Sequence, residues 1–150
     1  MVERATAKIE HSTEVEVATY QYDNSKVHKT LMSRLRGEAP FKLNVYIDKE
    51  MLQGNTPEKQ RARISELIRA GASVYVCQGP GKRGSYHFKC IVVDRRWLFE
   101  GSMNVTDKSL QNEEAPETAT GPLVAQYLER LSGHRAKGKL WDGKAQLSQF

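Results

Sequence analysis

The sequence has few cysteines and no long apolar run, and each absence excludes a class of protein. Two cysteines, Cys77 and Cys90, occur in 150 residues. Both lie in apolar, strand-like runs, so we predict two buried thiols rather than a disulfide framework. No stretch is long and apolar enough to span a bilayer, and the first residues lack the apolar core of a signal peptide. We therefore expect a soluble, cytoplasmic chain without stable membrane insertion.

Ligands for a metal ion are also scarce. The four histidines are scattered along the chain, and no group of Cys and His has the spacing of a zinc site. We therefore predict that the protein uses neither a metal nor a cofactor.

Net charge and length limit the possible binding partners and the number of domains. The chain carries 23 Lys and Arg against 18 Asp and Glu, a formal charge of +5. This modest excess suits nucleic acid or an acidic membrane surface, or serves only solubility. The length suits one domain with its own core. We predict a catalytic domain over residues 1–133 and a basic tail over residues 134–150.

Strand and helix patterns alternate in the first half of the chain. Strands are predicted at 14–20, 43–48, 74–77, 86–93 and 97–100, and helices begin near Asn24, Thr56 and Pro122. Gly71 and Gly133 are expected to end the second and the last of these helices. This order predicts an α/β fold with right-handed crossovers and a mixed, largely parallel β-sheet flanked by helices.

One run of residues suits chemistry on a phosphodiester. Its polar skeleton is His87-x-Lys89, four residues, Asp94, six residues, then Gly101-Ser102-x-Asn104. Because side chains alternate along a strand, His87 and Lys89 share a face. The Lys89 cation should lower the pKa of His87, and a neutral imidazole is a good nucleophile near physiological pH. Lys89 would also neutralise a phosphate oxygen whose charge grows in the transition state.

The second half of the run supplies neutral donors. The Ser102 hydroxyl and the Asn104 amide can contact the same phosphate, and Gly101 lets the backbone approach closely. Asp94 lies between two predicted strands, and we interpret it as a turn residue with a structural role. Each residue alone has an ordinary structural explanation, but their combination at this spacing favours a phosphate site.

The complete pattern resembles the signature of the phospholipase D superfamily, and every fixed position is met. The order of predicted elements from about residue 14 to 131 is similar as well. The resemblance implies a phospholipase D-like fold. It also implies that His87 is the nucleophile of a phosphohistidine intermediate, and that Lys89 and Asn104 hold phosphate oxygens with the help of Ser102.

The resemblance further implies an acid that orients the catalytic histidine. Glu113 is our candidate, and Glu114 is an equal rival because the spacing from the motif is approximate. The family mechanism needs two histidines, one to attack phosphorus and one to protonate the departing oxygen. Because the chain holds a single His-x-Lys pair, we predict a homodimer in which two copies of His87 share one site.

The predicted substrate follows from basic residues near the motif. Lys82 and Arg83 precede it and Arg95 and Arg96 lie in its turn, so we predict that they line a groove for a phosphate backbone. Tyr20, Tyr22 and Tyr86 are candidates for base stacking or for the walls of the site, and core packing is the alternative for each of them. Small single-motif members of the family are mostly endonucleases, with lipid-acting and RNA-acting cousins. We predict a metal-independent nuclease acting on DNA or RNA; the alternatives are a phospholipase D or phosphatidyltransferase acting on phospholipid, and a nucleic-acid-binding module without turnover.

Overall fold

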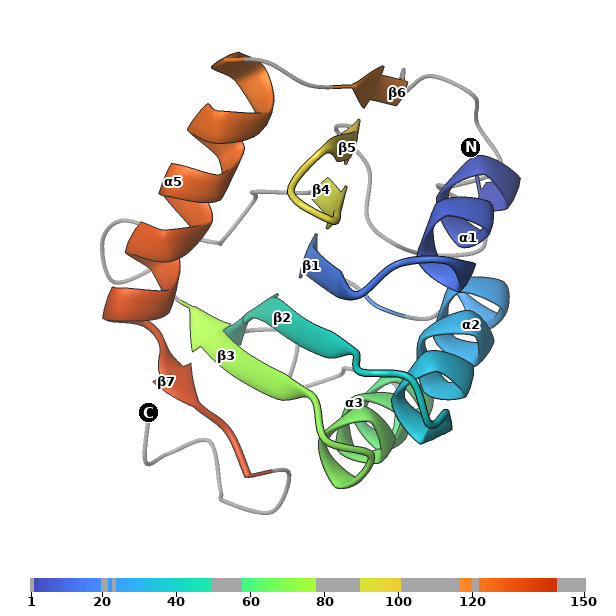
Figure 1. Cartoon of the computed structure of the whole chain (residues 1–150). Helices are drawn as coiled ribbons and strands as arrows, with labels where there is room; N and C mark the ends of the chain where they lie inside the picture. The colour runs from blue at the N-terminus through green and yellow to red at the C-terminus, as the bar shows by residue number, and fades with distance from the viewer. Residues whose placement is uncertain are drawn as a thin grey trace.

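The computed structural model describes residues 2–19, 22, 24–49, 58–77, 90–100, 117–119 and 122–142. Along the chain, the described elements are α1 (Val2–Glu10), β1 (Glu14–Thr19), α2 (Ser25–Arg36), β2 (Lys42–Asp48), α3 (Glu58–Arg69), β3 (Ser73–Cys77), β4 (Cys90–Val93), β5 (Trp97–Glu100), β6 (Glu117–Ala119), α5 (Pro122–Lys137) and β7 (Lys139–Leu140) (Figure 1).

The strands form one mixed sheet, which confirms the predicted α/β class. Their order is β6-β5-β4-β1-β2-β3-β7. β1 pairs in parallel with β2, and β2 with β3. The pairings of β4, β5, β6 and β7 are antiparallel. The parallel part is therefore limited to three strands and is smaller than the sequence predicts.

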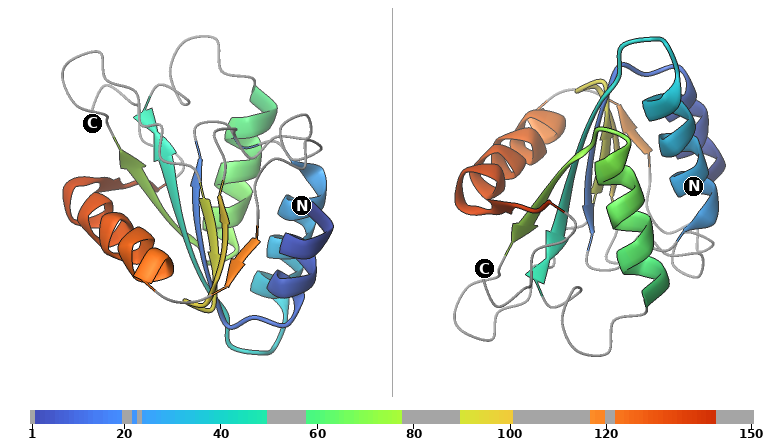
Figure 2. Two further views of the ribbon diagram at one scale, coloured as in Figure 1. Left: turned by 90° about the horizontal axis from the view of Figure 1, so that it is seen from above. Right: turned by 90° about the horizontal axis from the view of Figure 1, so that it is seen from below.

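Helices cover both faces of the sheet (Figure 2). Helices α1, α2 and α3 pack on one face, where Ile9, Leu31 and Leu67 join the larger apolar cluster. Helix α5 packs on the other face, where Val124 and Leu131 join the smaller cluster. Because both faces are covered, the central strands are buried along almost their whole length.

Local signals set the ends of the first predicted helices. The side chain of Asn24 accepts a hydrogen bond of 2.8 Å from the Val27 amide, which confirms it as the cap of α2. Gly71 follows α3 with a φ of 111°, a conformation that favours glycine. The start predicted at Thr56 lies outside the described residues.

The last helix is longer than predicted. Gly133 lies inside α5, which continues to Lys137, so the helix end expected at Gly133 is wrong. Gly138 directly follows the helix, and its amide donates a hydrogen bond of 2.7 Å to the carbonyl of His134. Trp141 follows and is buried in the larger apolar cluster. The first part of the predicted basic tail thus completes α5, adds β7 and contributes to the core.

Candidate active site

The three parallel strands define two edges of the sheet, one where they end and one where they begin. We call the end where β1, β2 and β3 finish, at Thr19, Asp48 and Cys77, the carboxyl edge. The opposite end, where these strands begin, is the amino edge. In sheets with parallel strands, ligands usually bind outside the carboxyl ends of the strands.

The two halves of the phosphodiester motif adjoin the sheet at the carboxyl edge. Cys90, the first residue of β4, directly follows Lys89, and Glu100, the last residue of β5, directly precedes Gly101. Cys90 and Glu100 are register partners. Cys90 also pairs with Ala18, next to the end of β1. The described strands therefore lead into both halves of the motif from adjacent points of one edge.

Most predicted site residues lie outside the described part of the chain. They are His87, Lys89, Gly101, Ser102, Asn104 and Glu113, together with Lys82 and Arg83. Their roles stay predictions.

Asp94 holds two distant turns together at the amino edge. One oxygen of its carboxylate accepts hydrogen bonds from the amides of Thr13 and Glu14, at 2.8 and 3.0 Å, and from the Thr13 hydroxyl at 3.2 Å. Its own amide donates to the carbonyl of Glu14 at 2.8 Å. The β4–β5 turn is tight, with a φ of 53° at Asp94 and 56° at Arg95. Asp94 therefore joins this turn to the start of β1.

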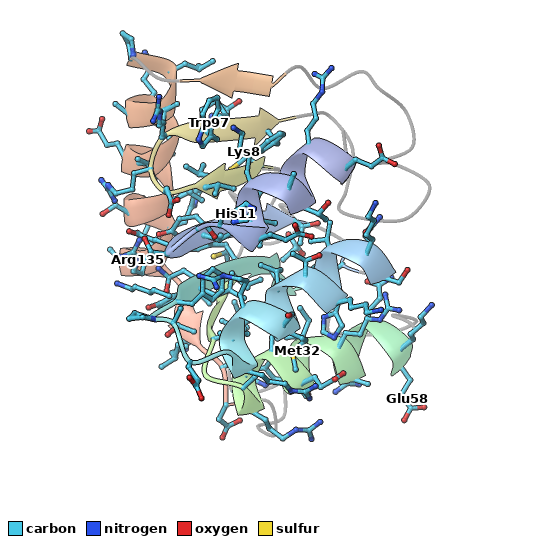
Figure 3. The ribbon with its side chains drawn as sticks, turned by 45° about the vertical axis from the view of Figure 1, so that its right-hand side comes forward. Lys8, His11, Met32, Glu58, Trp97 and Arg135 are labelled. Carbon is cyan, nitrogen blue, oxygen red and sulfur yellow. The ribbon has the colours of Figure 1, made fainter. Side chains whose placement is uncertain are left out.

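Arg95 and Arg96 lie in that same turn, at the far end of β4 from Cys90. A strand of four residues spans about 13 Å, so the turn is separated from the carboxyl edge by about this distance. Arg95 forms an ion pair with Glu14 at 3.9 Å. Arg96 lies 5.0 Å from the ring centre of Trp97, and Lys8 lies 3.6 Å from the same ring (Figure 3). Both arginines thus lie at the opposite end of β4 from Cys90, and their predicted role in a substrate groove stays a prediction.

A hollow of about 460 Å³ lies between this turn and α5. Its lining consists of Arg95, Val124, Ala125, Leu128, Glu129 and Ser132. Because Arg95 belongs to the amino edge, the hollow opens beside that edge of the sheet.

A buried polar chain joins the segment after β1 to α2 and α3. Tyr22 is fully buried, which places it in the core and excludes base stacking. Its hydroxyl lies 3.0 Å from Nδ1 of His28, and Nε2 of His28 lies 3.4 Å from a Glu66 carboxylate oxygen. A neutral imidazole with its proton on Nε2 satisfies both contacts. Burial lowers the pKa of His28 and favours this neutral form. The Tyr22 amide also donates to Gln60 of α3 at 3.2 Å, so Tyr22 is held through its side chain by α2 and through its backbone by α3.

A second polar cluster lies between the sheet and α5. Glu16, which is 1% exposed, accepts hydrogen bonds from Asn44 at 3.1 Å and from Arg135 at 3.2 Å. Arg135 also donates to the Tyr46 hydroxyl at 3.0 Å. Burial, followed by the Glu16 carboxylate, raises the pKa of Tyr46 well above its usual value. The second Glu16 oxygen has no hydrogen-bond partner among the described residues. Arg135 therefore compensates a buried charge and links α5 to the sheet.

The two cysteines are free and buried, as predicted. Cys77 ends β3 beside Asp48, its register partner on β2. Burial, with the Asp48 charge as a second cause, raises the pKa of Cys77 to about 12. This thiol is protonated at neutral pH and is a poor nucleophile.

The described residues offer neither a metal site nor a membrane span. No three His, Cys, Asp or Glu side chains within the described ranges gather as a metal site would require. None of the helices in the part of the chain that the structure describes could cross a membrane.

A mixed sheet between three helices and one helix, with the motif adjoining two neighbouring strands, defines a phospholipase D-like domain. A family model described as "Cardiolipin synthase, PLD-like domain" matches residues 6–132. The match covers most of the chain, and the chain belongs to this family of the phospholipase D superfamily.

Solved structures share the fold at low sequence identity. Nuc from Salmonella typhimurium, a phospholipase D family member, matches with a TM-score of 0.72 and 19% identity over 93% of this chain and 89% of its own. NucT from Helicobacter pylori matches with a TM-score of 0.73 and 16% identity over 93% of this chain and 90% of its own. A phosphatidylserine synthase from Haemophilus influenzae matches with a TM-score of 0.63 and 10% identity over 97% of this chain and 37% of its own. A search of curated protein sequences gives no match.

Reasoning from the sequence missed both polar clusters. Glu16 was a detectable signal, because an acid in the middle of a strand buried on both faces needs a partner. Its partner Arg135 lies 119 residues away, and no local pattern connects the two.

Proposed function

We propose that this chain is a metal-independent phosphodiesterase that hydrolyses nucleic acid through a phosphohistidine intermediate, in a site shared by two identical subunits. The observation that carries the proposal is the register of β4 and β5, with Cys90 opposite Glu100 at the carboxyl edge. The next residues along the chain are Lys89 and Gly101. Because neighbouring strands lie about 4.8 Å apart, this pairing supports one phosphate site built from both halves of the motif.

The reaction proceeds in two displacements. A neutral imidazole nitrogen of His87 attacks phosphorus and forms a nitrogen–phosphorus bond while the bond to the leaving oxygen breaks. That oxygen takes a proton from His87 of the partner subunit. The partner's His87 then removes a proton from water, which attacks phosphorus, breaks the nitrogen–phosphorus bond and restores the first imidazole. Lys89 and Asn104 hold the phosphate oxygens throughout.

The choice of nucleic acid has two supports. The structures of Nuc and NucT match along about nine tenths of their own length, whereas the phosphatidylserine synthase matches along 37% of its length. The likeness therefore extends over almost the whole of these two chains, and small single-motif members of the family are mostly endonucleases. Lys82 and Arg83, just before the motif, suit a phosphate backbone.

The first experiment compares substrates in the presence of EDTA. Plasmid, a single-stranded oligonucleotide and phosphatidylcholine liposomes are each incubated with the protein, with His87→Asn as the inactive variant and His11→Asn as the matched control at an exposed histidine. We expect nucleic-acid cleavage that survives EDTA, persists in the control and disappears in His87→Asn. Release of phosphatidate would instead identify a phospholipase, and bound but intact DNA would identify a binding module.

The second experiment tests whether two subunits share one site. Wild-type protein is mixed with His87→Asn under conditions that allow subunits to exchange. If one site needs both copies of His87, an equal mixture retains about a quarter of the wild-type activity per total protein, because about a quarter of the dimers hold two intact copies. Retention of half the activity would show that each subunit works alone.

A further inference from the structure

The positive charge of the protein is concentrated on two neighbouring helices. Together α2 and α3 carry eight Lys and Arg and two Glu, a net charge of +6. The chain has 23 basic and 18 acidic side chains, so the remainder holds 15 and 16, a net charge of −1. The excess charge of +5 therefore lies entirely on α2 and α3.

Most of these cations are open to solvent. They are Lys26, Lys29, Arg34, Arg36, Lys59, Arg61, Arg63 and Arg69, and all are exposed except Arg34 and Arg63, which are half-buried. One of the two acids, Glu66, lies between the helices, 3.4 Å from His28 and 3.8 Å from Arg36. Lys26 also pairs with Glu3 of α1 at 4.0 Å, and Arg34 donates to the carbonyl of Ser12. With Glu3 included, eight cations still face only three acids. We call this set of cations the α2/α3 basic strip.

The strip begins at the edge that adjoins the motif. Each of the two helices follows a parallel strand and therefore starts at the carboxyl edge, and each runs back toward the amino edge (Figures 1 and 3). Lys26, Lys29, Lys59 and Arg61 lie in the first turns. A helix of 12 residues is about 18 Å long, which corresponds to about five base pairs of duplex at 3.4 Å each.

We infer that the α2/α3 basic strip binds the backbone of the nucleic acid that the protein cleaves, over about five nucleotides beyond the reacting phosphate. The inference rests on the proposed function, because it takes the carboxyl edge as the place of cleavage. The strip is a second candidate for backbone contacts, beside Arg95 and Arg96 at the amino edge. Exposed cations along a groove or stripe bind phosphates without regard to sequence.

An anionic membrane is the competing partner, and the packing of the helices disfavours it. A helix that lies on a membrane inserts its apolar face among the lipids. The apolar residues of α2 and α3, such as Leu31 and Leu67, are buried in the core instead. Among the described residues, the large hydrophobic side chain that is exposed is Leu140, which lies on β7. The strip thus offers charge without an apolar face, which suits nucleic acid.

Charge reversal within the strip tests the inference. Lys29→Glu with Arg61→Glu is compared with Lys137→Glu and Lys139→Glu, an equal charge change at exposed residues at the end of α5 and on β7. All proteins carry His87→Asn to prevent cleavage, and thermal melts verify folding. Anisotropy of a labelled 30-nucleotide single strand gives Kd at several salt concentrations. For Lys29→Glu with Arg61→Glu, the strip variant, we expect Kd to rise at least about tenfold at about 0.1 M salt. The slope of log Kd against log salt concentration should fall by about 1.4 for this variant. For the control variant, Kd should change by less than about twofold.

Cleavage assays with an intact His87 separate the strip from the active site. The strip variant should raise KM about tenfold for the 30-nucleotide strand and leave hydrolysis of bis(p-nitrophenyl) phosphate unchanged, because this substrate has no neighbouring nucleotides that could contact the strip. Failure of the wild type to cleave any phosphodiester would overturn the proposed function. The anisotropy measurements would still show whether the strip binds the oligonucleotide.

Two outcomes would overturn the inference itself. Equal weakening of DNA binding by both double variants would show that only the overall charge matters. Binding of phosphatidylglycerol vesicles through the strip, without binding of the oligonucleotide, would assign it to a membrane. If Lys29→Glu with Arg61→Glu fails to fold, the neutral pair Lys29→Gln with Arg61→Gln is used, with about half the change in log Kd expected.

Discussion

Removal of the Arg135 cation, which belongs to α5 and faces the sheet, should destabilise the protein strongly. In Arg135→Met, Glu16 loses its ion pair while it remains 1% exposed. Breaking a buried ion pair costs about 3–5 kcal/mol because an uncompensated charge stays behind. The Arg135 side chain is 36% exposed, so water partly shields the pair and the lower end, about 3 kcal/mol, applies. For a chain of this size, the expected fall in Tm is about 6–12 °C.

The assay is urea unfolding followed by far-UV circular dichroism, with thermal melts as a second measurement. Lys137→Met removes a cation from the exposed end of α5 and serves as the matched control, with an expected change below about 0.5 kcal/mol. Glu16→Gln should restore about 2 kcal/mol in the Arg135→Met background, because a neutral amide still accepts from Asn44. A loss below about 1 kcal/mol for Arg135→Met, or no recovery in the double variant, would refute the reasoning.

Four further predictions follow from single residues. Gly133→Ala should raise the free energy of unfolding by about 0.5–1 kcal/mol, because Gly133 is helical and an added Cβ meets open space. Gly138→Ala should lower it by about 1–3 kcal/mol, because an added Cβ would lie 2.8 and 3.1 Å from two backbone carbonyl oxygens; urea unfolding measures both. Cys77, buried and with its pKa raised to about 12, should react with Ellman's reagent only after unfolding. Because burial lowers the pKa of His28, the unfolded state takes up a proton first, so stability should fall as the pH drops below about 6.5, and a His28→Gln variant should show a smaller fall in melts at pH 5 and pH 8.

Elements governed by short-range signals could be predicted from the sequence. Asn24 caps α2 and Gly71 follows α3 because both positions depend on the backbone within one turn. Gly133 looked like a helix end for the same reason. The real end at Gly138 depends on close approach to the carbonyl of Val76 on β3, a contact that forms only in the folded sheet.

The candidate site could likewise be predicted only in part from the sequence. The motif was recognisable because its residues lie close together in the sequence and suit one chemistry. Arg95 and Arg96 were assigned to the substrate groove because they are near the motif in sequence, but β4 carries them to the other edge of the sheet. The α2/α3 basic strip was missed because its two halves are separated by a strand, and a total charge of +5 does not show how the charge is distributed.

The position of β1 between β2 and β4 has a consequence for synthesis. Val15 pairs with Leu43 on one side and with Val93 on the other, so one edge of β1 finds its partner 28 residues later and the opposite edge 78 residues later. As the chain leaves the ribosome, β1, β2 and β3 can assemble first, while β1 presents an unpaired apolar edge. Release of the chain before β4 has emerged should therefore yield aggregates. Nascent chains with residues 1–85 outside the ribosome should bind a chaperone more strongly than nascent chains with β4 outside as well.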